Sequence, residues 1–170
     1  MTKRRYNLAV IRYRGTLLLL NRIKPPFAGL WNGIGGKTEP DETPISGMQR
    51  ELFEETGLQT NQYTLQNAGW IDWHIDGETI APIDIFLVDI LPTVQLPLYP
   101  VGMREGVLQL FEPEWAQAAD NQGIVADLQA ILPTVLSGQL NRYDTDFHAD
   151  QMIFFEAIPI TEPREGEEAL

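Results

Sequence analysis

Apolar runs separated by short polar breaks dominate the first part of the chain and predict strands. Residues 6–13 and 16–21 are two such runs, with Arg14 and Gly15 between them, so we expect two strands joined by a tight turn. Residues 24–36 contain repeated proline and glycine, which predicts a loop or a very short strand. The chain therefore begins as a sheet and then enters a glycine-rich loop.

Four further segments have the pattern of strands. Residues 68–75 and 83–91 flank a turn at residues 76–77, and residues 107–111 and 151–158 are also apolar and β-prone. The sheet should thus draw its strands from most of the chain.

A helix is predicted between Thr43 and Gly57. Threonine is a favourable N-cap residue, Pro44 suits the first helical position, and glycine is a common C-terminal stop. Ile45, Met48 and Leu52 recur at helical spacing, giving this helix an apolar stripe to lay on the sheet.

A second helical region is expected over residues 114–136, ending near Gly138, with one apolar face formed by Ile124, Leu128, Ile131 and Leu132. Helices on both sides of a mixed sheet, an α/β/α sandwich, fit these elements best. We expect one domain over residues 1–160. The acidic end, residues 161–170, is expected to be a flexible tail.

Composition narrows the classes of partner. The net charge is −12, with 12 Lys plus Arg against 24 Asp plus Glu, so no broad positive field is present to hold a nucleic-acid polymer. A phosphate-bearing small molecule would need a divalent cation as a bridge. The absence of cysteine excludes disulfides and thiolate metal sites. The apolar runs are too short to span a membrane, so a cytoplasmic location is the default expectation.

The predicted helix carries three carboxylates on one side. Glu51, Glu54 and Glu55 stand at positions i, i+3 and i+4, so one turn projects them together. By spacing alone, a solvated acidic face is the simpler interpretation. The alternative is a Mg²⁺ site, because Mg²⁺ takes carboxylate oxygens and shares its other positions with water and phosphates.

Arg50 and Gly36 have two interpretations each. The guanidinium of Arg50 can hold Glu42 or Glu51 in one orientation, or it forms only a surface ion pair of little energetic value. Gly36 either lets the backbone approach a ligand or merely serves a turn.

These residues together match the pattern G-x5-E-x7-R-E-U-x-E-E-x-G-U, where U is apolar. The nine matching positions are Gly36, Glu42, Arg50, Glu51, Leu52, Glu54, Glu55, Gly57 and Leu58. The stretch resembles the box of the Nudix hydrolases, which implies a loop-helix-loop on a sandwiched sheet and hydrolysis of a diphosphate linked to another moiety.

The resemblance also implies roles for these residues. The metal ligands would be Glu51, Glu54 and Glu55 with the carbonyl of Gly36, and the cofactor Mg²⁺, with Mn²⁺ as an alternative. Arg50 and Glu42 would be orienting partners in catalysis. Which glutamate acts as general base differs among family members.

The segment before the box, from Leu30 to Lys37, is similar to the W-N-x-x-G-G-K stretch of Nudix enzymes that cleanse oxidised purine nucleotides. Trp31, Asn32 and Lys37 are therefore expected at the substrate. Asn32 has the donor and acceptor needed to read a purine edge, although it could equally cap the turn.

Four weaker assignments follow from the same resemblance. Arg22 stands where related enzymes carry a basic residue near the nucleotide, and Glu105 where some carry another acidic group near the metal. For these two residues a non-functional interpretation has equal weight: Arg22 could be a solvated strand end, and Glu105 could be only a turn residue. Asp120 and Asn121 are candidates for contact with the base.

The remaining aromatic and histidine residues favour structural roles. Trp70, Trp73 and Phe86 could stack on a base, but on strands they are more often core. His74 and His148 have no spacing typical of a metal site or a nucleophile relay, so ordinary histidines are expected.

Three functions compete. The first is a pyrophosphohydrolase that cuts a nucleoside triphosphate such as 8-oxo-dGTP into the monophosphate and pyrophosphate. The second keeps this chemistry on ADP-ribose, a nucleotide sugar, a dinucleoside polyphosphate or an RNA 5′ end. The third is a nucleotide sensor without turnover, which the full set of box carboxylates disfavours. The oligomeric state is left open, with a homodimer among the options.

Overall fold

One mixed sheet organises the computed structural model, which describes residues 4–164. Its nine strands lie in the order β6-β7-β2-β1-β5-β4-β8-β9, and β3 pairs with β2 outside this path. The strands are β1 (Tyr6–Tyr13), β2 (Thr16–Arg22), β3 (Trp31–Asn32), β4 (Tyr63–Ile75), β5 (Glu78–Ile90), β6 (Val101–Met103), β7 (Gly106–Phe111), β8 (Asn141–His148) and β9 (Gln151–Pro159). The pairs β1–β5 and β4–β8 are parallel and the others antiparallel.

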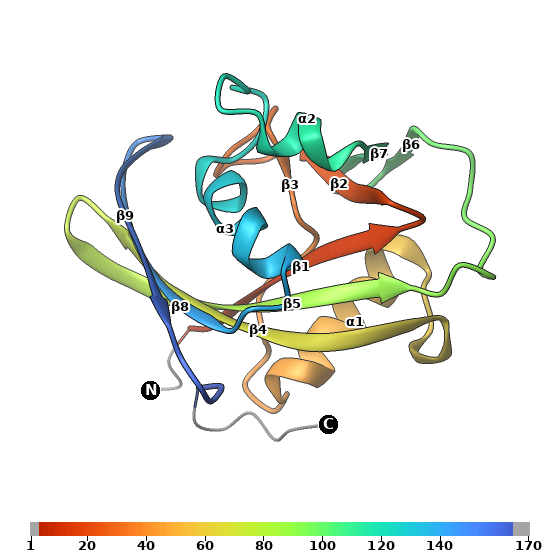
Figure 1. Cartoon of the computed structure of the whole chain (residues 1–170), viewed down its shortest axis with the longest axis horizontal. Coiled ribbons are helices and arrows are strands. Elements are labelled where there is room, and N and C mark those ends of the chain that lie inside the picture. The colour runs from red at the N-terminus through yellow and green to blue at the C-terminus, as the bar shows by residue number, and fades with distance from the viewer. Residues whose placement is uncertain (1–3, 165–170) are drawn as a thin grey trace.

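Helices cover both faces of the sheet, as predicted. Helix α1 (Pro44–Thr56) lies on one face, and the short helix α2 (Pro113–Gln117) and helix α3 (Ala126–Leu136) lie on the other (Figure 1). A 3₁₀ turn, η1 (Thr60–Gln62), precedes β4. Within residues 4–164 no helix has the length and apolarity needed to cross a membrane.

The leucine run of β2 shows how this sandwich is encoded. Leu17 and Leu19 point into the core beneath α2 and α3, whereas Leu18 and Leu20 point into the core beneath α1. All four are buried. A strand that is covered on both faces needs apolar residues on both, so the run is continuous where a half-exposed strand would alternate.

Helix α1 begins and ends where the sequence predicts. The hydroxyl of Thr43 accepts a hydrogen bond from the backbone N–H of Ser46 at 3.1 Å, and Pro44 is the first helical residue. Gly57 closes the helix in the left-handed region, with φ of 75°. Met48 and Leu52 are fully buried, so the predicted stripe does anchor the helix on the sheet.

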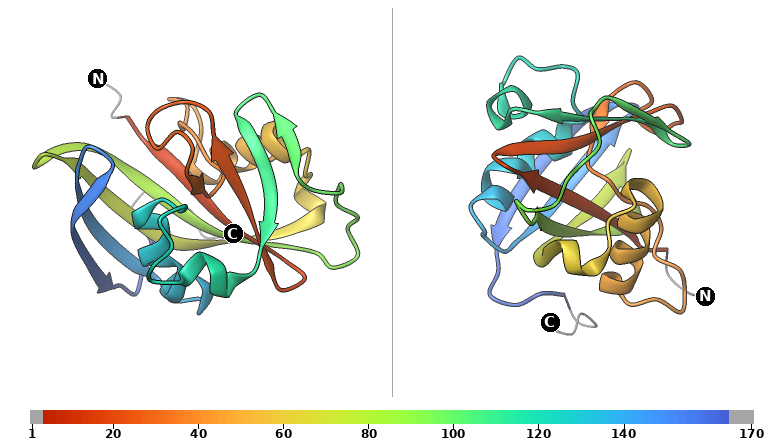
Figure 2. Two further views of the ribbon diagram at one scale, coloured as in Figure 1. Left: turned by 90° about the horizontal axis from the view of Figure 1, so that it is seen from above. Right: turned by 90° about the vertical axis from the view of Figure 1, so that its right-hand side faces the viewer.

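The two predicted tight turns are also present. Residues 14–15 join β1 to β2 and residues 76–77 join β4 to β5. Because β4 and β8 are parallel, the turn ends of the β4–β5 and β8–β9 hairpins lie on the same side of the molecule (Figure 2).

The prediction of one continuous helical region over residues 114–136 was wrong. The segment between α2 and α3 leaves the helical path, since the Gly123 carbonyl accepts from the N–H of Trp31 and the N–H of Val125 donates to the carbonyl of Trp31. These bonds attach the segment to β3, and the helix restarts at Ala126. The predicted apolar face still holds, because its four residues are buried.

Strands β6 and β8 were missed, and β4 begins earlier than predicted, at Tyr63. Of the predicted tail, residues 161–164 follow β9 without regular structure, and residues 165–170 lie outside the described part of the chain.

Candidate active site

The end of α1 carries the predicted glutamates. Glu51 is buried, with 9% of its surface exposed, because the backbone of Gly36 lies directly against it. A Cβ on Gly36 would lie 2.4 Å from Oε1 of Glu51, so a larger residue here would displace the Glu51 carboxylate. The Glu54 side chain is 54% exposed and Glu55 is half-buried. The carboxylates therefore extend from the protein interior to solvent along one helix turn.

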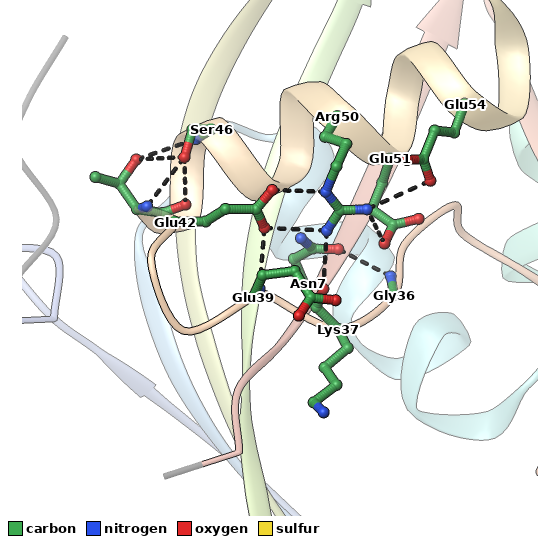
Figure 3. Close-up of polar contacts among 10 residues, drawn as sticks. Asn7, Gly36, Lys37, Glu39, Glu42, Ser46, Arg50, Glu51 and Glu54 are labelled. Atoms are coloured by element: carbon green, nitrogen blue, oxygen red, sulfur yellow. Dashed lines mark hydrogen bonds and ion pairs between the residues drawn. The ribbon is translucent and has the colours of Figure 1, made fainter. Parts of the chain in front are cut away.

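Arg50 ties this cluster to the preceding loop (Figure 3). Its guanidinium binds Glu42 through two hydrogen bonds of 2.6 and 3.0 Å, and it binds Glu51 at 2.9 Å. It also donates to the carbonyl of Lys37 at 3.0 Å and lies 3.3 Å from Glu54. The arginine thus joins the loop to the helix through Glu42 and Glu51, the two carboxylates that the sequence analysis named as its possible partners.

A cavity of about 620 Å³ opens beside these glutamates. It is lined by Leu20, Arg22, Gly35, Gly36, Glu51, Glu54, Glu55, Met103, Arg104 and Glu105. Below, this space is called the acidic cavity. Arg22 lies at the end of β2, and Glu105 lies in the β6–β7 turn. The backbone carbonyl of Glu105 accepts a hydrogen bond from the N–H of Ile23 at 3.2 Å, which holds the turn beside the end of β2. The fold therefore brings both weak assignments, Arg22 and Glu105, to the predicted glutamates.

The carboxyl of Glu55 is electrostatically strained. Its pKa is raised to about 8, chiefly by burial and then by the neighbouring charges of Glu51 and Glu105, against the opposing effect of Arg22. Its Oε2 atom is buried without a hydrogen-bond partner. Burial likewise raises the pKa of Glu51, although the hydrogen bond from Arg50 opposes this shift. The Arg50 hydrogen bonds lower the pKa of Glu42.

This chemistry fits a divalent cation. In residues 4–164 no three acidic or histidine side chains are already gathered closely enough to enclose an ion. Yet a buried carboxylate oxygen that lacks a partner and faces two further carboxylates is unfavourable unless a proton or a cation joins it. Hard oxygen donors are the ligands that Mg²⁺ prefers. Glu51, Glu54 and Glu55, with the Gly36 backbone, could therefore hold the ion.

A second cavity of about 230 Å³ adjoins the first. It is lined by Tyr6, Asn7, Leu8, Arg22, Pro26, Phe27, Asn32, Gly33, Gly35, Gly36, Trp73, Ile83 and Asp127. We call it the aromatic cavity. The rings of Tyr6 and Trp73 meet edge to face, with centroids 6.1 Å apart. Arg22, Gly35 and Gly36 line both spaces, so one ligand could extend from the aromatic cavity to the glutamates.

Two polar side chains stand among these apolar walls. Asn32 accepts a hydrogen bond from the N–H of Gly33 at 2.8 Å through its Oδ1, so its amide NH₂ remains as a donor. Asp127, in the first turn of α3, is only 5% exposed, and burial raises its pKa to about 6. Asp127 was not predicted. An acidic residue in the first helical turn is common, so only its place on the buried face could have singled it out.

The other predicted substrate residues lie away from these two cavities. Trp31 packs edge to face on Phe111 at 4.5 Å, beside the core. Lys37 lines a separate cavity with Arg4 and Arg5. Asp120 is exposed, and Asn121 bonds to the carbonyl of Trp115 at 2.8 Å. Their contact with substrate stays a prediction.

The aromatic and histidine residues divide between wall and scaffold. Phe86 is fully buried in the core, whereas Trp73 lines the aromatic cavity. His74 lies 3.1 Å from Asp144, and the exposed His148 lies 2.7 Å from Asp76, which raises the pKa of His148. Both histidines are remote from the glutamates in sequence and line neither cavity.

Fold and site together define an α/β protein in which a loop-helix-loop presents a glutamate cluster to the acidic cavity, which adjoins the aromatic cavity. The family model described as NUDIX domain matches residues 2–98, more than half of the chain. The chain belongs to the Nudix family.

Several relatives with curated names match part of the chain. The chain is 36% identical over 89 residues to the oxidized purine nucleoside triphosphate hydrolase of Mus musculus, covering 52% of this chain and 56% of that protein. It is 35% identical over 54 residues to the 8-oxo-dGTP diphosphatase of Proteus vulgaris, covering 32% of this chain and 48% of the relative. The chain thus spans about half the length of the curated relatives that it matches.

The fold extends this similarity beyond the aligned sequence. A MutT protein from Bacillus halodurans superposes with a TM-score of 0.69 at 20% identity, covering 91% of this chain and 97% of that one. At this level of identity the match concerns the fold alone. It agrees with the predicted mixed sheet between helices.

Proposed function

We propose that this protein is a Mg²⁺-dependent nucleoside triphosphate pyrophosphohydrolase that acts on oxidised purine nucleotides such as 8-oxo-dGTP. The observation that carries the proposal is the continuity of the two cavities, which share Arg22 between the glutamates and the aromatic walls. A base in one cavity would place its phosphates in the other. The names of the relatives above support the same substrate class.

The glutamate cluster would hold the metal through Glu51, Glu54, Glu55 and the Gly36 carbonyl. The chemistry supplied by bound Mg²⁺, or Mn²⁺, is neutralisation of phosphate charge and acidification of the attacking water. Arg50 keeps Glu51 in one orientation by pairing it with Glu42 through the guanidinium. Arg22 adds a positive charge where the phosphates would pass between the cavities.

Hydrolysis adds water across a phosphoanhydride bond, and a carboxylate must accept the proton released from that water. Glu54 suits this role because its side chain is exposed, at 54%, and its contact with Arg50 is the longest of the three carboxylates at 3.3 Å. Glu105, across the acidic cavity, is the alternative base. The products are the nucleoside monophosphate and pyrophosphate.

Recognition of the base would fall to Asn32 and Asp127. The amide NH₂ of Asn32 donates, and the Asp127 carboxyl, with its pKa raised to about 6, accepts or donates according to its protonation. Such paired donors and acceptors distinguish purine edges. Tyr6 and Trp73 provide aromatic surface for the ring.

The test is an assay of 8-oxo-dGTP, dGTP, ADP-ribose and a diadenosine polyphosphate with Mg²⁺, resolving the products. We expect the highest kcat/KM for 8-oxo-dGTP, with monophosphate and pyrophosphate as products. The variant Glu54→Gln should lose at least a hundredfold in kcat. The control is Glu114→Gln, because Glu114 is an exposed glutamate on α2, and this variant should keep the kcat of the unaltered protein.

Each alternative has its own signature in the same assay. A higher kcat/KM for another substrate would refute the substrate and leave the hydrolase. Tight nucleotide binding without turnover of any compound would instead identify a sensor. Unchanged activity of Glu54→Gln would refute the assignment of the metal site.

A further inference from the structure

Asn7, in the middle of the sheet on β1, contacts the glycine backbone of the site through two hydrogen bonds. Its backbone N–H donates to the carbonyl of Gly36 at 2.9 Å. Its side-chain Oδ1 accepts from the N–H of Gly36 at 2.9 Å (Figure 3). One residue therefore holds the peptide groups on both sides of Gly36.

The glycine backbone is enclosed on its other sides as well. A Cβ on Gly35 would lie 2.0 Å from the carbonyl oxygen of Asn7, and a Cβ on Gly36 would lie 2.4 Å from Oε1 of Glu51. The backbone at Gly35 and Gly36 is thus packed between β1 and α1. The position of Asn7 determines how the Gly36 carbonyl stands relative to Glu51.

The Asn7 side chain is costly for the fold by itself. It is 3% exposed, and its Nδ2 atom is buried without a hydrogen-bond partner. A half-satisfied buried amide destabilises a protein relative to an apolar side chain of the same size. The adjacent residues Leu8, Ala9 and Val10 are all apolar. Packing alone would therefore favour another apolar residue at position 7.

We propose that Asn7 is a positioning residue, which fixes the orientation of Gly36 so that its carbonyl serves the metal site formed with the glutamates. A carbonyl oxygen has two lone pairs, and the Asn7 N–H engages one, which leaves the other for a cation. The side-chain bond to the Gly36 N–H prevents the preceding peptide from rotating. This inference rests on the metal site of the proposed function.

The test compares three variants of the metal-free protein without nucleotide. Asn7→Leu removes the acceptor at nearly constant volume, and Asn7→Asp keeps an acceptor. Asn141→Leu is the matched control, because Asn141 is also a strand residue that is 3% exposed, and it lines none of the three cavities described above. Mn²⁺ binding is measured by titration calorimetry, and exchange of the Gly36 amide hydrogen by NMR.

We expect Asn7→Leu to bind Mn²⁺ at least tenfold more weakly, the usual effect of losing a residue that orients a metal ligand. Its Gly36 amide should exchange at least tenfold faster. Asn7→Asp should keep the slow exchange of the Gly36 amide, because the aspartate still accepts its hydrogen bond. Amide exchange thus reports this bond independently of any effect that the added negative charge has on Mn²⁺ affinity. Asn141→Leu should change neither quantity, even if its melting temperature falls.

Mn²⁺ affinity of Asn7→Leu within twofold of the unaltered protein would overturn the inference, as would an equal loss in Asn141→Leu. If Asn7→Leu does not fold, Asn7→Ser, whose side chain is too short to reach Gly36, is judged by the same thresholds. Failure of the unaltered protein to bind Mn²⁺ would refute the proposed metal site instead, and rapid Gly36 exchange in it would refute the positioning role.

Discussion

The Arg50 network should contribute several kcal/mol to stability before any ligand binds. Arg50→Met removes two charge-assisted hydrogen bonds to Glu42 and one to Glu51. The three side chains are only 29%, 17% and 12% exposed, so water replaces these bonds incompletely. Breaking a largely buried ion pair costs about 3 kcal/mol, at the lower end of the usual range because Arg50 is part-exposed. This cost corresponds to a fall in Tm of roughly 6 to 12 °C for a chain of this length.

The pH dependence of this loss has a defined sign. Hydrogen bonds from Arg50 lower the pKa of Glu42 below its ordinary value of 4.5. A depressed carboxyl pKa stabilises the folded state above the pKa of the unfolded chain, and the contribution disappears as pH falls through the folded pKa. The difference between the unaltered protein and Arg50→Met should therefore be largest near neutral pH and shrink in acid.

Urea denaturation in EDTA at pH 7 and at pH 4 measures this difference. The control is Arg142→Met, because Arg142 pairs with Asp72 at 2.7 Å but the two side chains are 44% and 25% exposed. Such a surface pair is worth less than about 1 kcal/mol. If Arg50→Met costs no more than Arg142→Met at pH 7, the network does not clamp the loop as we reason.

Three further predictions concern single residues. The pKa of Glu55 is about 8 in the folded protein and 4.5 in its ordinary state, so between pH 4.5 and pH 8 the protein takes up a proton when it folds. The free energy of unfolding should therefore fall as pH rises from 4.5 to 8. Glu55→Gln should flatten that slope in urea denaturation between pH 5 and 8, and an unchanged slope would contradict the burial argument. The pKa of Asp127 is likewise raised, to about 6 from an ordinary 3.8, so ionised Asp127 destabilises the folded protein at pH 7. Asp127→Asn should therefore be more stable at pH 7, by up to roughly 3 kcal/mol. Its KM for a purine nucleotide should rise about tenfold. A variant less stable than the parent would show that Asp127 is not strained by burial. Thr43→Ala should lower the free energy of unfolding by about 1 kcal/mol, because the N-cap of α1 is lost, and should leave kcat unchanged. A calorimetric Tm equal to that of the unaltered protein would contradict this.

Helix α1 could be predicted in detail because its determinants are local. The cap at Thr43, the stop at Gly57 and the buried pair Met48 and Leu52 all lie within one segment, so spacing alone places them. The break between α2 and α3 could not be predicted in this way. It depends on backbone bonds to Trp31, which is distant in sequence and pairs with Gly123 and Val125 only after folding.

Strand β8 was missed although its sequence has a signal. Asn141, Tyr143, Thr145 and Phe147 are buried, and the residues between them are polar, which is the alternation typical of a strand with one covered face. The number of charged residues among the polar positions disguised this period. Strand β6 has only three residues and offers no comparable pattern.

The sequence predicts the acidic cavity better than the aromatic cavity, because local spacing groups the residues of the first and only tertiary folding groups those of the second. The acidic cavity takes three carboxylates from one helix turn, so helical spacing already groups Glu51, Glu54 and Glu55. The aromatic cavity is assembled from β1, β4 and α3, and no spacing relates Tyr6, Trp73 and Asp127. Burial then changes the chemistry of what it assembles.

Helical spacing identifies the acidic residues of the site but leaves their protonation undetermined. The exposed Glu54 and the half-buried Glu55 occupy the same turn, yet the pKa of Glu55, raised to about 8, keeps its carboxyl largely protonated at pH 7 in the protein without a cation. That difference arises mainly because the fold buries Glu55, and then because Glu51 and, from the β6–β7 turn, Glu105 stand near it, while Arg22 from β2 opposes the shift. The sequence therefore predicts where a cation would bind, and the tertiary structure determines how many protons its binding must displace.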